Sequence, residues 1–326
     1  MKKNNFLILA LLNSNFVFAD CIPFKEEHKA EKYRISEIVL DIENIFNLDL
    51  DGEKTGFHKT ANKLHTKTKK NIISRELLFE ENEVIENRVL AESERVLRSK
   101  PFVKDATIKP IAKCDDGIVV KVITKDNWSL QPSVSFGTSG GKSKYSFEIQ
   151  EKNLFGFGKS LEFKYKRGIE RKEKSIRYND PNLLGSNKRL ELSYQNNSDG
   201  ERQYFELIQP FTSLQTKSFW GINHLKWDLV RPIYQNGEVF EEFGQSIKKN
   251  EVKLGRLVKS NDNNFHRLYF GMTSDENKFL NTQNYPITLL PEDRDYQYPW
   301  VAYEFFNETM PRFEAFFEEY KDVIEG

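Results

Sequence analysis

Hydrophobic and polar residues alternate with a period of two along most of the chain after Trp128. Successive side chains of a β-strand point to opposite faces, so this pattern predicts strands with one apolar and one polar face. Turn sequences such as Ser139-Gly140-Gly141 and Asn236-Gly237 separate the runs, which predicts about ten or eleven antiparallel strands between residues 128 and 307. The clearest apolar rows are Leu130, Pro132, Val134 and Phe136; Tyr145, Phe147 and Ile149; Leu161, Phe163 and Tyr165; Leu190, Leu192 and Tyr194; Leu225, Trp227 and Leu229; and Leu268, Phe270 and Met272.

Charged residues such as Glu148, Lys164 and Asp228 occupy the faces opposite these rows. Two architectures share this pattern. In a membrane β-barrel the apolar faces meet lipid and the polar faces line a wet lumen. In a soluble sheet the polar face meets solvent and the apolar face packs on a core. The periodicity alone does not separate them.

The first residues predict export. Lys2 and Lys3 precede the apolar run 6–12, and Val17-Phe18-Ala19 forms a cleavage site, so residues 1–19 are interpreted as a signal peptide. Residues 20–32 are interpreted as a flexible leader. An exported chain can oxidise its two cysteines, Cys21 and Cys114, but the leader position of Cys21 favours no disulfide between them.

Residues 33–127 show a mixed pattern and are interpreted as a separate α+β domain. The pattern predicts one strand, two helices and then two strands. Asn82 is expected to cap the second helix, and Pro101 to stop it. The expected elements are a strand over 35–42, helices over 60–65 and 83–99, and strands over 103–111 and 117–125.

Composition and charge argue against several classes of protein. Lys and Arg number 49 and Asp and Glu also number 49, so the chain lacks the basic excess of a general nucleic-acid binder. Aromatic residues make up 13% of the chain, which is too many for a disordered protein. No set of acid, base and nucleophile converges, so we expect no enzyme, no cofactor and no metal site.

Two short motifs do not change this interpretation. Gly137 to Gly141 matches the G-x-S-x-G pattern of a hydrolase nucleophile turn, but a strand rather than a helix is predicted after it. The segment 47–52 resembles the start of a calcium loop, but its twelfth position is His58 and not a bidentate glutamate.

Several segments resemble the BamA/TamA family of outer-membrane proteins. The element order of residues 33–127 is that of a POTRA domain, and the segments that start at Arg75, Glu92 and Pro101 are similar to the last POTRA module of that family. The segment 151–159 resembles the Asn-Leu-x-Gly-x-Gly turn of its early barrel strands, and 178–185 resembles its Tyr-x-Asp-Pro corner. The residues that carry the two turns are Asn153, Gly156, Gly158, Asp180, Pro181 and Gly185.

The resemblance implies a periplasmic POTRA domain followed by an antiparallel transmembrane β-barrel in the outer membrane. It implies a role in membrane-protein assembly or translocation, with outer-membrane lipid, unfolded outer-membrane or secreted clients and other subunits of the assembly machinery as partners, and no nucleic acid. A POTRA sheet edge would bind an extended client by strand addition. The edge expected here runs along Val103, Asp105, Thr107 and Lys109.

The chain departs from the family at its C-terminal end. The segment 128–307 offers too few strands for the complete barrel, 286–299 is interpreted as a long extracellular loop, and 308–326 as a helical tail. We therefore expect a C-terminally truncated member with an incomplete barrel. Two alternatives stay open: a non-transport outer-membrane surface protein, and a soluble periplasmic β-rich binding module.

Overall fold

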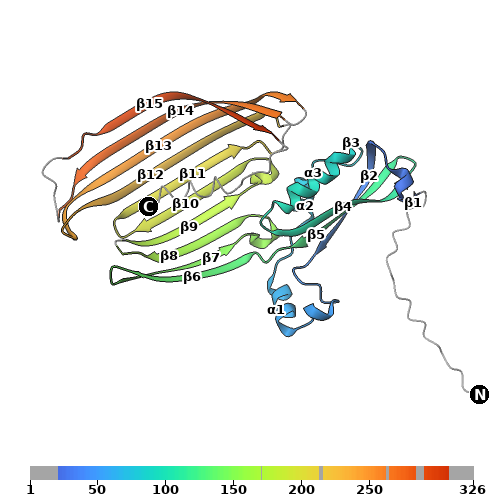
Figure 1. The fold of residues 1–326 in the computed structure, drawn as a ribbon, viewed down its shortest axis with the longest axis horizontal. Coiled ribbons are helices and arrows are strands. Elements are labelled where there is room, and N and C mark those ends of the chain that lie inside the picture. Colours follow the sequence, from blue (N-terminus) through green and yellow to red (C-terminus); the bar gives the residue numbers. More distant parts are fainter. Residues whose placement is uncertain (1–20, 170, 213–215, 262–263, 284–289, 308–326) are drawn as a thin grey trace, which may run out of the picture. The chain divides into compact units, whose positions relative to one another are not determined.

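The computed structural model describes residues 21–169, 171–212, 216–261, 264–283 and 290–307 (Figure 1). The chain divides into two compact units. The first comprises the described residues up to Asn62 and Lys69–Asn127; the second comprises Lys63–Thr68 and the described residues from Trp128 onward. The predicted signal peptide, 1–19, and helical tail, 308–326, lie outside the described residues. No helix in the described ranges is long and apolar enough to span a membrane.

The first unit contains a five-stranded sheet with the order β1-β4-β5-β2-β3. β2 and β5 are parallel, and the other neighbouring pairs are antiparallel. The strands are β1 (Cys21–Pro23), β2 (Lys32–Glu43), β3 (Val84–Glu86), β4 (Val103–Cys114) and β5 (Gly117–Asp126).

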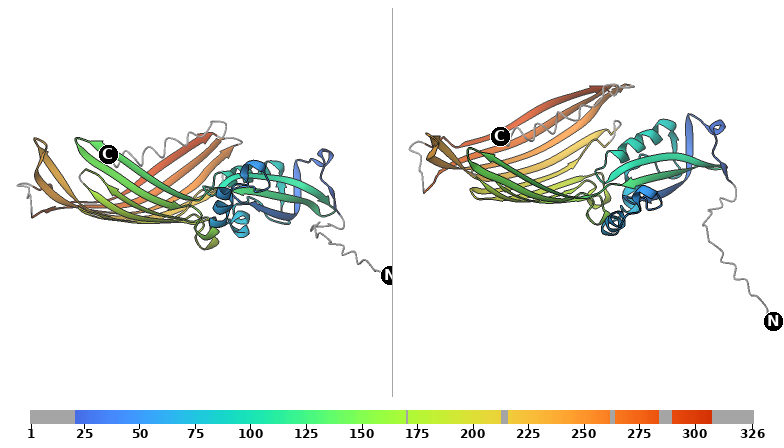
Figure 2. Two further views of the ribbon diagram at one scale, coloured as in Figure 1. Left: turned by 90° about the horizontal axis from the view of Figure 1, so that it is seen from below. Right: turned by 60° about the horizontal axis from the view of Figure 1, so that its bottom comes forward.

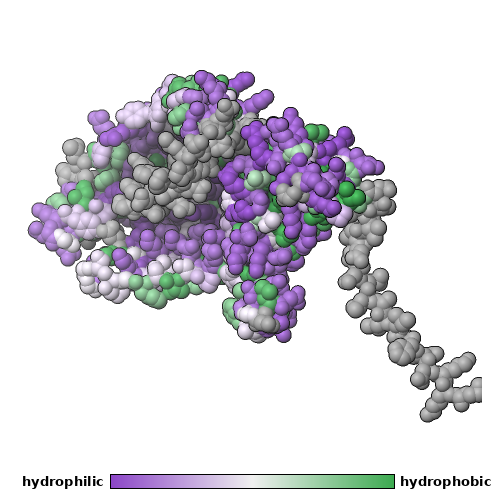
Figure 3. Space-filling model, turned by 45° about the vertical axis from the view of Figure 1, so that its right-hand side comes forward, coloured by the Kyte–Doolittle hydropathy of each residue, from purple (hydrophilic) through white to green (hydrophobic). Residues whose placement is uncertain are grey.

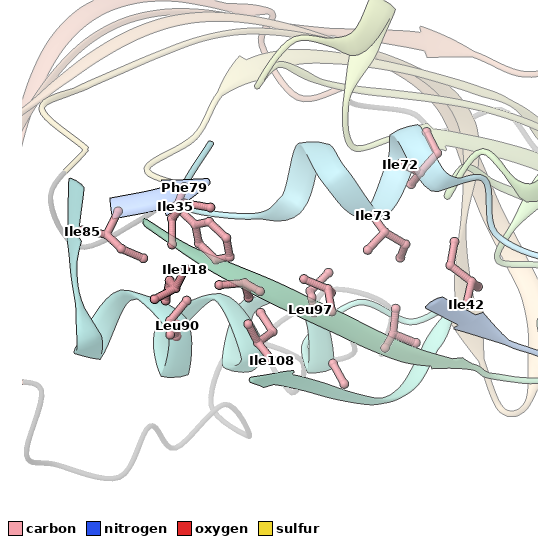
Figure 4. Close-up of a cluster of buried hydrophobic side chains, with 14 of the residues drawn as sticks. Ile35, Ile42, Ile72, Ile73, Phe79, Ile85, Leu90, Leu97, Ile108 and Ile118 are labelled. Carbon is pink, nitrogen blue, oxygen red and sulfur yellow. The ribbon is translucent and has the colours of Figure 1, made fainter. Parts of the chain in front are cut away.

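Helices α1 (Gly56–Leu64), α2 (Lys70–Glu76) and α3 (Asn87–Arg98) accompany this sheet. The helical spacing of Leu90, Ser93 and Leu97 buries one face of α3. Its exposed face carries two ion pairs, Glu92 with Arg95 and Glu94 with Arg98. Figure 4 shows the resulting core, in which branched aliphatic side chains from α2, α3 and the sheet meet.

Two expectations for this unit need correction. The helix predicted over 83–99 begins only at Asn87, because residues 84–86 form β3 and pair with β2 at 32–34. Asn82 has a left-handed φ of 68° and lies before β3, so it is not the helix cap. Pairing with another strand thus overrides the helical spacing of Val84 and Ile85. Helix α2 was not among the predicted elements.

The disulfide expectation was also wrong. Cys21 and Cys114 form a disulfide, and β1 pairs with the end of β4 with these two cysteines in register. The N–H of Phe24 also donates to the carbonyl oxygen of Ile111 at 3.0 Å. Residues 21–24 are therefore part of the sheet and not of a flexible leader.

The second unit is a ten-stranded sheet in which every strand pairs with its sequence neighbour. All pairs are antiparallel. The strands are β6 (Leu130–Ser139), β7 (Lys142–Glu151), β8 (Ser160–Arg167), β9 (Lys172–Asp180), β10 (Arg189–Asn197), β11 (Gly200–Gln209), β12 (Ser218–Gln235), β13 (Glu238–Asn261), β14 (Asn264–Asn281) and β15 (Arg294–Asn307).

This sheet is open. β6 and β15 are its two edges, and no pairing joins them among the described strands. Figure 2 shows the strands curving into a trough. An antiparallel sheet that is not closed was expected and is confirmed. Part of the predicted loop at 286–299 is strand instead, because β15 begins at Arg294 and pairs with β14 from there.

Strand register divides the side chains between an apolar face and a charged face. Directly opposite residues point to the same face, so a row can be followed across the sheet. One such row joins Leu190, Leu207, Ile222, Val252 and Met272. Neighbouring members of the apolar face are well exposed, among them Phe136, Phe147, Phe163, Leu254, Phe270 and Val301.

The opposite face carries a network of charged and polar groups. Glu148 pairs with Lys164 at 3.7 Å, and Arg189 pairs with Glu206 at 2.7 Å. The amide of Asn223 donates to Glu251 at 2.8 Å. Figure 3 shows hydrophilic residues gathered in the hollow of the sheet.

The face predicted for β12 was wrong. Register with β11 places Trp227 opposite Arg202 and Leu225 opposite Tyr204, on the charged face. The guanidinium of Arg202 lies 5.5 Å from the centre of the Trp227 ring. Lys226 and Asp228 lie on the other face, beyond the apolar row that ends on this strand at Ile222. In this part of β12, Leu225 and Trp227 lie on the charged face, and Lys226 and Asp228 lie on the face of the apolar row. The alternation along the strand therefore did not reveal which of its faces continues the row.

Candidate functional site

Two turns at one end of the ten-stranded sheet have nearly the same backbone. The β7–β8 turn contains Asn153-Leu-Phe-Gly156, and the β9–β10 turn contains Asn182-Leu-Leu-Gly185. The first asparagine has φ −140° and ψ 50°, and the second −136° and 61°. The leucine N–H after each asparagine donates to a lysine carbonyl, Lys159 at 2.8 Å and Lys188 at 2.7 Å. Both segments were expected to form turns, and the structure shows the same backbone motif in each.

Each turn holds a bulky residue in the left-handed region. Phe155 has φ 54° and Leu184 has φ 53°. A residue with a Cβ costs about 1–2 kcal/mol in this conformation, and glycine or asparagine is usual there. Phe155 is 69% exposed and Leu184 is 95% exposed. The surrounding fold therefore maintains strain without burying either side chain, which is typical of surfaces that serve a function.

Asn153 anchors the first turn. Its side chain is almost fully buried, its Oδ1 accepts the Gly158 N–H at 2.7 Å, and its Nδ2 donates to Thr68 Oγ1 at 2.8 Å. Thr68 lies in the segment Lys63–Thr68, which belongs to the second unit although it precedes α2 in the chain. Sequence reasoning missed this contact, because 85 residues separate its two partners.

Lys159 and Asp180 join the two turns. Lys159 Nζ lies 3.0 Å from Asp180 Oδ2, and the Asp180 side chain is 2% exposed. Hydrogen bonding to Asp180 raises the pKa of Lys159 above its usual value, while partial burial opposes the shift. Asp180 Oδ1 also accepts the N–H of Asn182 at 3.1 Å. Pro181 between them has no N–H, so it leaves the ladder without losing a hydrogen bond.

Replacing Gly156 by alanine is expected to lower the free energy of unfolding of the sheet by about 2 kcal/mol. Gly156 has φ 77°, and an added Cβ would overlap the backbone carbonyl oxygen of Lys67. Gly140→Ala is the matched control, because Gly140 has φ 56° but open space around it. Denaturant unfolding measures both values. Equal losses would show that segment 63–68 does not press on the turn.

The predicted client-binding edge lies in the first unit. Asp105, Thr107 and Lys109 are exposed, whereas the side chain of Val103 is buried in the core. Asp105 Oδ1 accepts from Arg98 Nε at 3.2 Å and from its neighbour's N–H, so this carboxylate is engaged within the unit. β1 covers β4 only at residues 112–114, and no described strand pairs with the outer side of β4 before Ile111.

The structure thus brings the turn residues together and places the β4 edge in the other unit. In the described ranges, no group of three or more His, Cys, Asp or Glu side chains could hold a metal ion.

Models of protein families give no match to this chain, and neither do curated proteins. Two solved structures are similar to it. BamA from Haemophilus ducreyi lacking POTRA domains 1–3 has 12% identity and a TM-score of 0.42, over 80% of this chain and 56% of that chain. CdiB from Acinetobacter baumannii has 13% identity and a TM-score of 0.39, over 84% of this chain and 42% of that chain. The chain spans about half the length of these structures, and its function has to follow from its own residues.

Proposed function

We propose that the chain is an outer-membrane protein whose ten-stranded sheet is part of a β-barrel wall, with the first unit as a periplasmic POTRA-like domain. The observation that carries this proposal is the apolar face, which continues from β6 to β15 and is exposed on every strand pair. A soluble monomer rarely exposes so large an apolar surface. The charged face opposite it suits a wet lumen.

The row on the apolar face moves along the strands from one side of the sheet to the other. Followed through the register, Phe163 in β8 aligns with Tyr194 in β10, whereas Val252 in β13 aligns with Leu190, four residues earlier on β10. Strands that tilt against a barrel axis produce this stagger. The open edges β6 and β15 would leave backbone groups unpaired in lipid, so the wall needs further strands to close.

Membrane fractionation tests the proposal. The mature protein is expected to stay with outer membranes after carbonate extraction and to migrate differently on gels before and after boiling. Release into the soluble fraction, with no heat-dependent shift, would contradict a membrane-spanning sheet and favour the soluble binding module.

We further propose that the outer side of β4 binds extended segments of client proteins by strand addition. Backbone hydrogen bonds would give affinity with little dependence on sequence. The support is the unpaired length of β4 before Ile111, with exposed side chains at Thr107 and Lys109. Once the short β1 and β3 are set aside, the first unit has one strand, three helices and two strands, which is the expected POTRA order with one additional helix.

A photo-crosslinking amino acid at Lys109 is expected to capture an unfolded outer-membrane protein at least several times more often than the same probe at Lys121. The two positions are directly opposite each other on β4 and β5, so they share one face of the sheet. Only Lys109 lies where the outer side of its strand has no partner among the described strands. Equal capture at both positions would indicate binding to the face and would contradict strand addition.

A further inference from the structure

The end of the sheet that carries the two turns combines exposed apolar tips with unpaired cations. Phe155 and Leu184 are the tips. Lys63 and Lys67 come from the segment that packs on the first turn, and Lys152 and Lys188 flank the two turns. We call these six residues the basic turn surface. The turns are held side by side by the ion pair of Lys159 with Asp180.

The charged residues of the basic turn surface are all lysines. Within the described part of the chain, Lys63, Lys67, Lys152 and Lys188 form no ion pair. Two acidic residues next to the turns in the sequence are engaged within the protein: Glu151 Oε1 accepts the N–H of Asn153 at 2.7 Å, and Asp180 is paired with Lys159. The lysine side chains are therefore available to an anionic partner.

An apolar cavity of about 290 Å³ lies beside the first turn. Leu64, Trp128, Leu130 and Phe155 contribute to its lining. Leu130 is also the first residue of the apolar row on β6. The cavity is thus continuous with the sheet face that the proposed function assigns to lipid.

Exposed apolar side chains with lysines nearby are the pattern of interfacial anchors that insert into lipid and contact phosphate headgroups. We propose that the basic turn surface binds the periplasmic leaflet of the membrane, with Phe155 and Leu184 entering the headgroup region and the four lysines contacting anionic lipid phosphates. This inference rests on the proposed membrane location of the sheet. It explains why the fold holds two bulky residues in left-handed backbone without burying them.

A tryptophan at position 184 reports on the tip. Leu184→Trp keeps a large apolar side chain at a site that is 95% exposed, so it disturbs no packing. The protein is reconstituted into phosphatidylcholine vesicles with or without acyl-chain bromination, and its quenching is compared with that of the parent protein, which contains four tryptophans. Gln235→Trp is the matched control, because Gln235 is exposed at the tip of the long β12–β13 hairpin, at the other end of the sheet.

The added tryptophan at 184 is expected to be quenched by brominated lipid and to emit at shorter wavelength, and the one at 235 to do neither. A tip that emits as in water and is not quenched, in protein that resists carbonate extraction, would overturn the lipid contact and leave the proposed function standing. Protein that carbonate releases would overturn both.

The role of the four lysines is tested by changing the charge of the lipid. Adding phosphatidylglycerol to the vesicles at low salt is expected to deepen the quenching of Leu184→Trp, and K63Q/K67Q/K152Q/K188Q in the same background is expected to abolish this gain. Each lysine near an anionic surface contributes up to about fivefold in affinity, and salt screens the effect. Quenching that does not respond to phosphatidylglycerol in the parent would refute the phosphate contacts.

Discussion

Replacing both Cys21 and Cys114 by serine is expected to lower the free energy of unfolding of the first unit by about 4–5 kcal/mol. The disulfide joins residues 93 apart, and a cross-link over so long a loop removes much conformational entropy from the unfolded chain. It also fixes β1, whose three residues are too few to hold a strand in place by pairing alone.

Amide hydrogen exchange on the full-length protein measures this change, because the first unit contains no tryptophan to report on it. Peptides from β4, β5 and α3 should lose protection by a factor of about a thousand in the double variant, which is 4–5 kcal/mol at about 1.4 kcal/mol per tenfold. Reduction of the parent protein by dithiothreitol is the control and should give the same loss. Unchanged protection in both cases would show that the bond contributes nothing to the fold.

The sequence predicted the larger elements of the fold because their signals are long. Ten strands of alternating residues give repeated evidence for one architecture, and the apolar rows of β6, β8 and β14 lie on one face as expected. The errors concern short or ambiguous segments. β1 and β3 have three residues each, and only their partners in the sheet make them strands. Cys21 was assigned to a leader for the same reason.

In the candidate site, too, local sequence features were predicted and long-range contacts were not. Asn153, Gly156 and Asp180 were identified as turn residues through the family resemblance of segments 151–159 and 178–185, and glycine at such a position permits a tight turn. Their partners were not recognisable. The contact of Asn153 with Thr68 spans 85 residues, and the ion pair of Lys159 with Asp180 depends on the register of β8 against β9. Such contacts follow from tertiary pairing, on which a local pattern carries no information.

In the proposed membrane-spanning sheet, Phe163→Arg is expected to lower the free energy of unfolding in phospholipid vesicles by about 2–4 kcal/mol, because an arginine at the membrane midplane must leave water. Phe163 lies in the middle of β8, between Ile149 and Ile176 on the neighbouring strands, and is 47% exposed. An arginine introduced on the charged face is the control. Ser133→Arg lies directly opposite Glu148 and should cost little or nothing.

The energetic cost of an arginine depends on its depth in a membrane, and this dependence distinguishes lipid from a covering protein layer. Tyr165 lies two residues further along β8 on the same face, and its ring centre is 6.0 Å from that of Tyr145, as in the aromatic girdle at a membrane interface. Tyr165→Arg should therefore cost only about 0–1 kcal/mol, since arginine near the interface reaches water. Against a packed protein layer the two substitutions would cost similar amounts. In a soluble protein with this face in water, neither would cost anything, so only the gradient from Phe163 to Tyr165 agrees with a sheet that crosses the membrane.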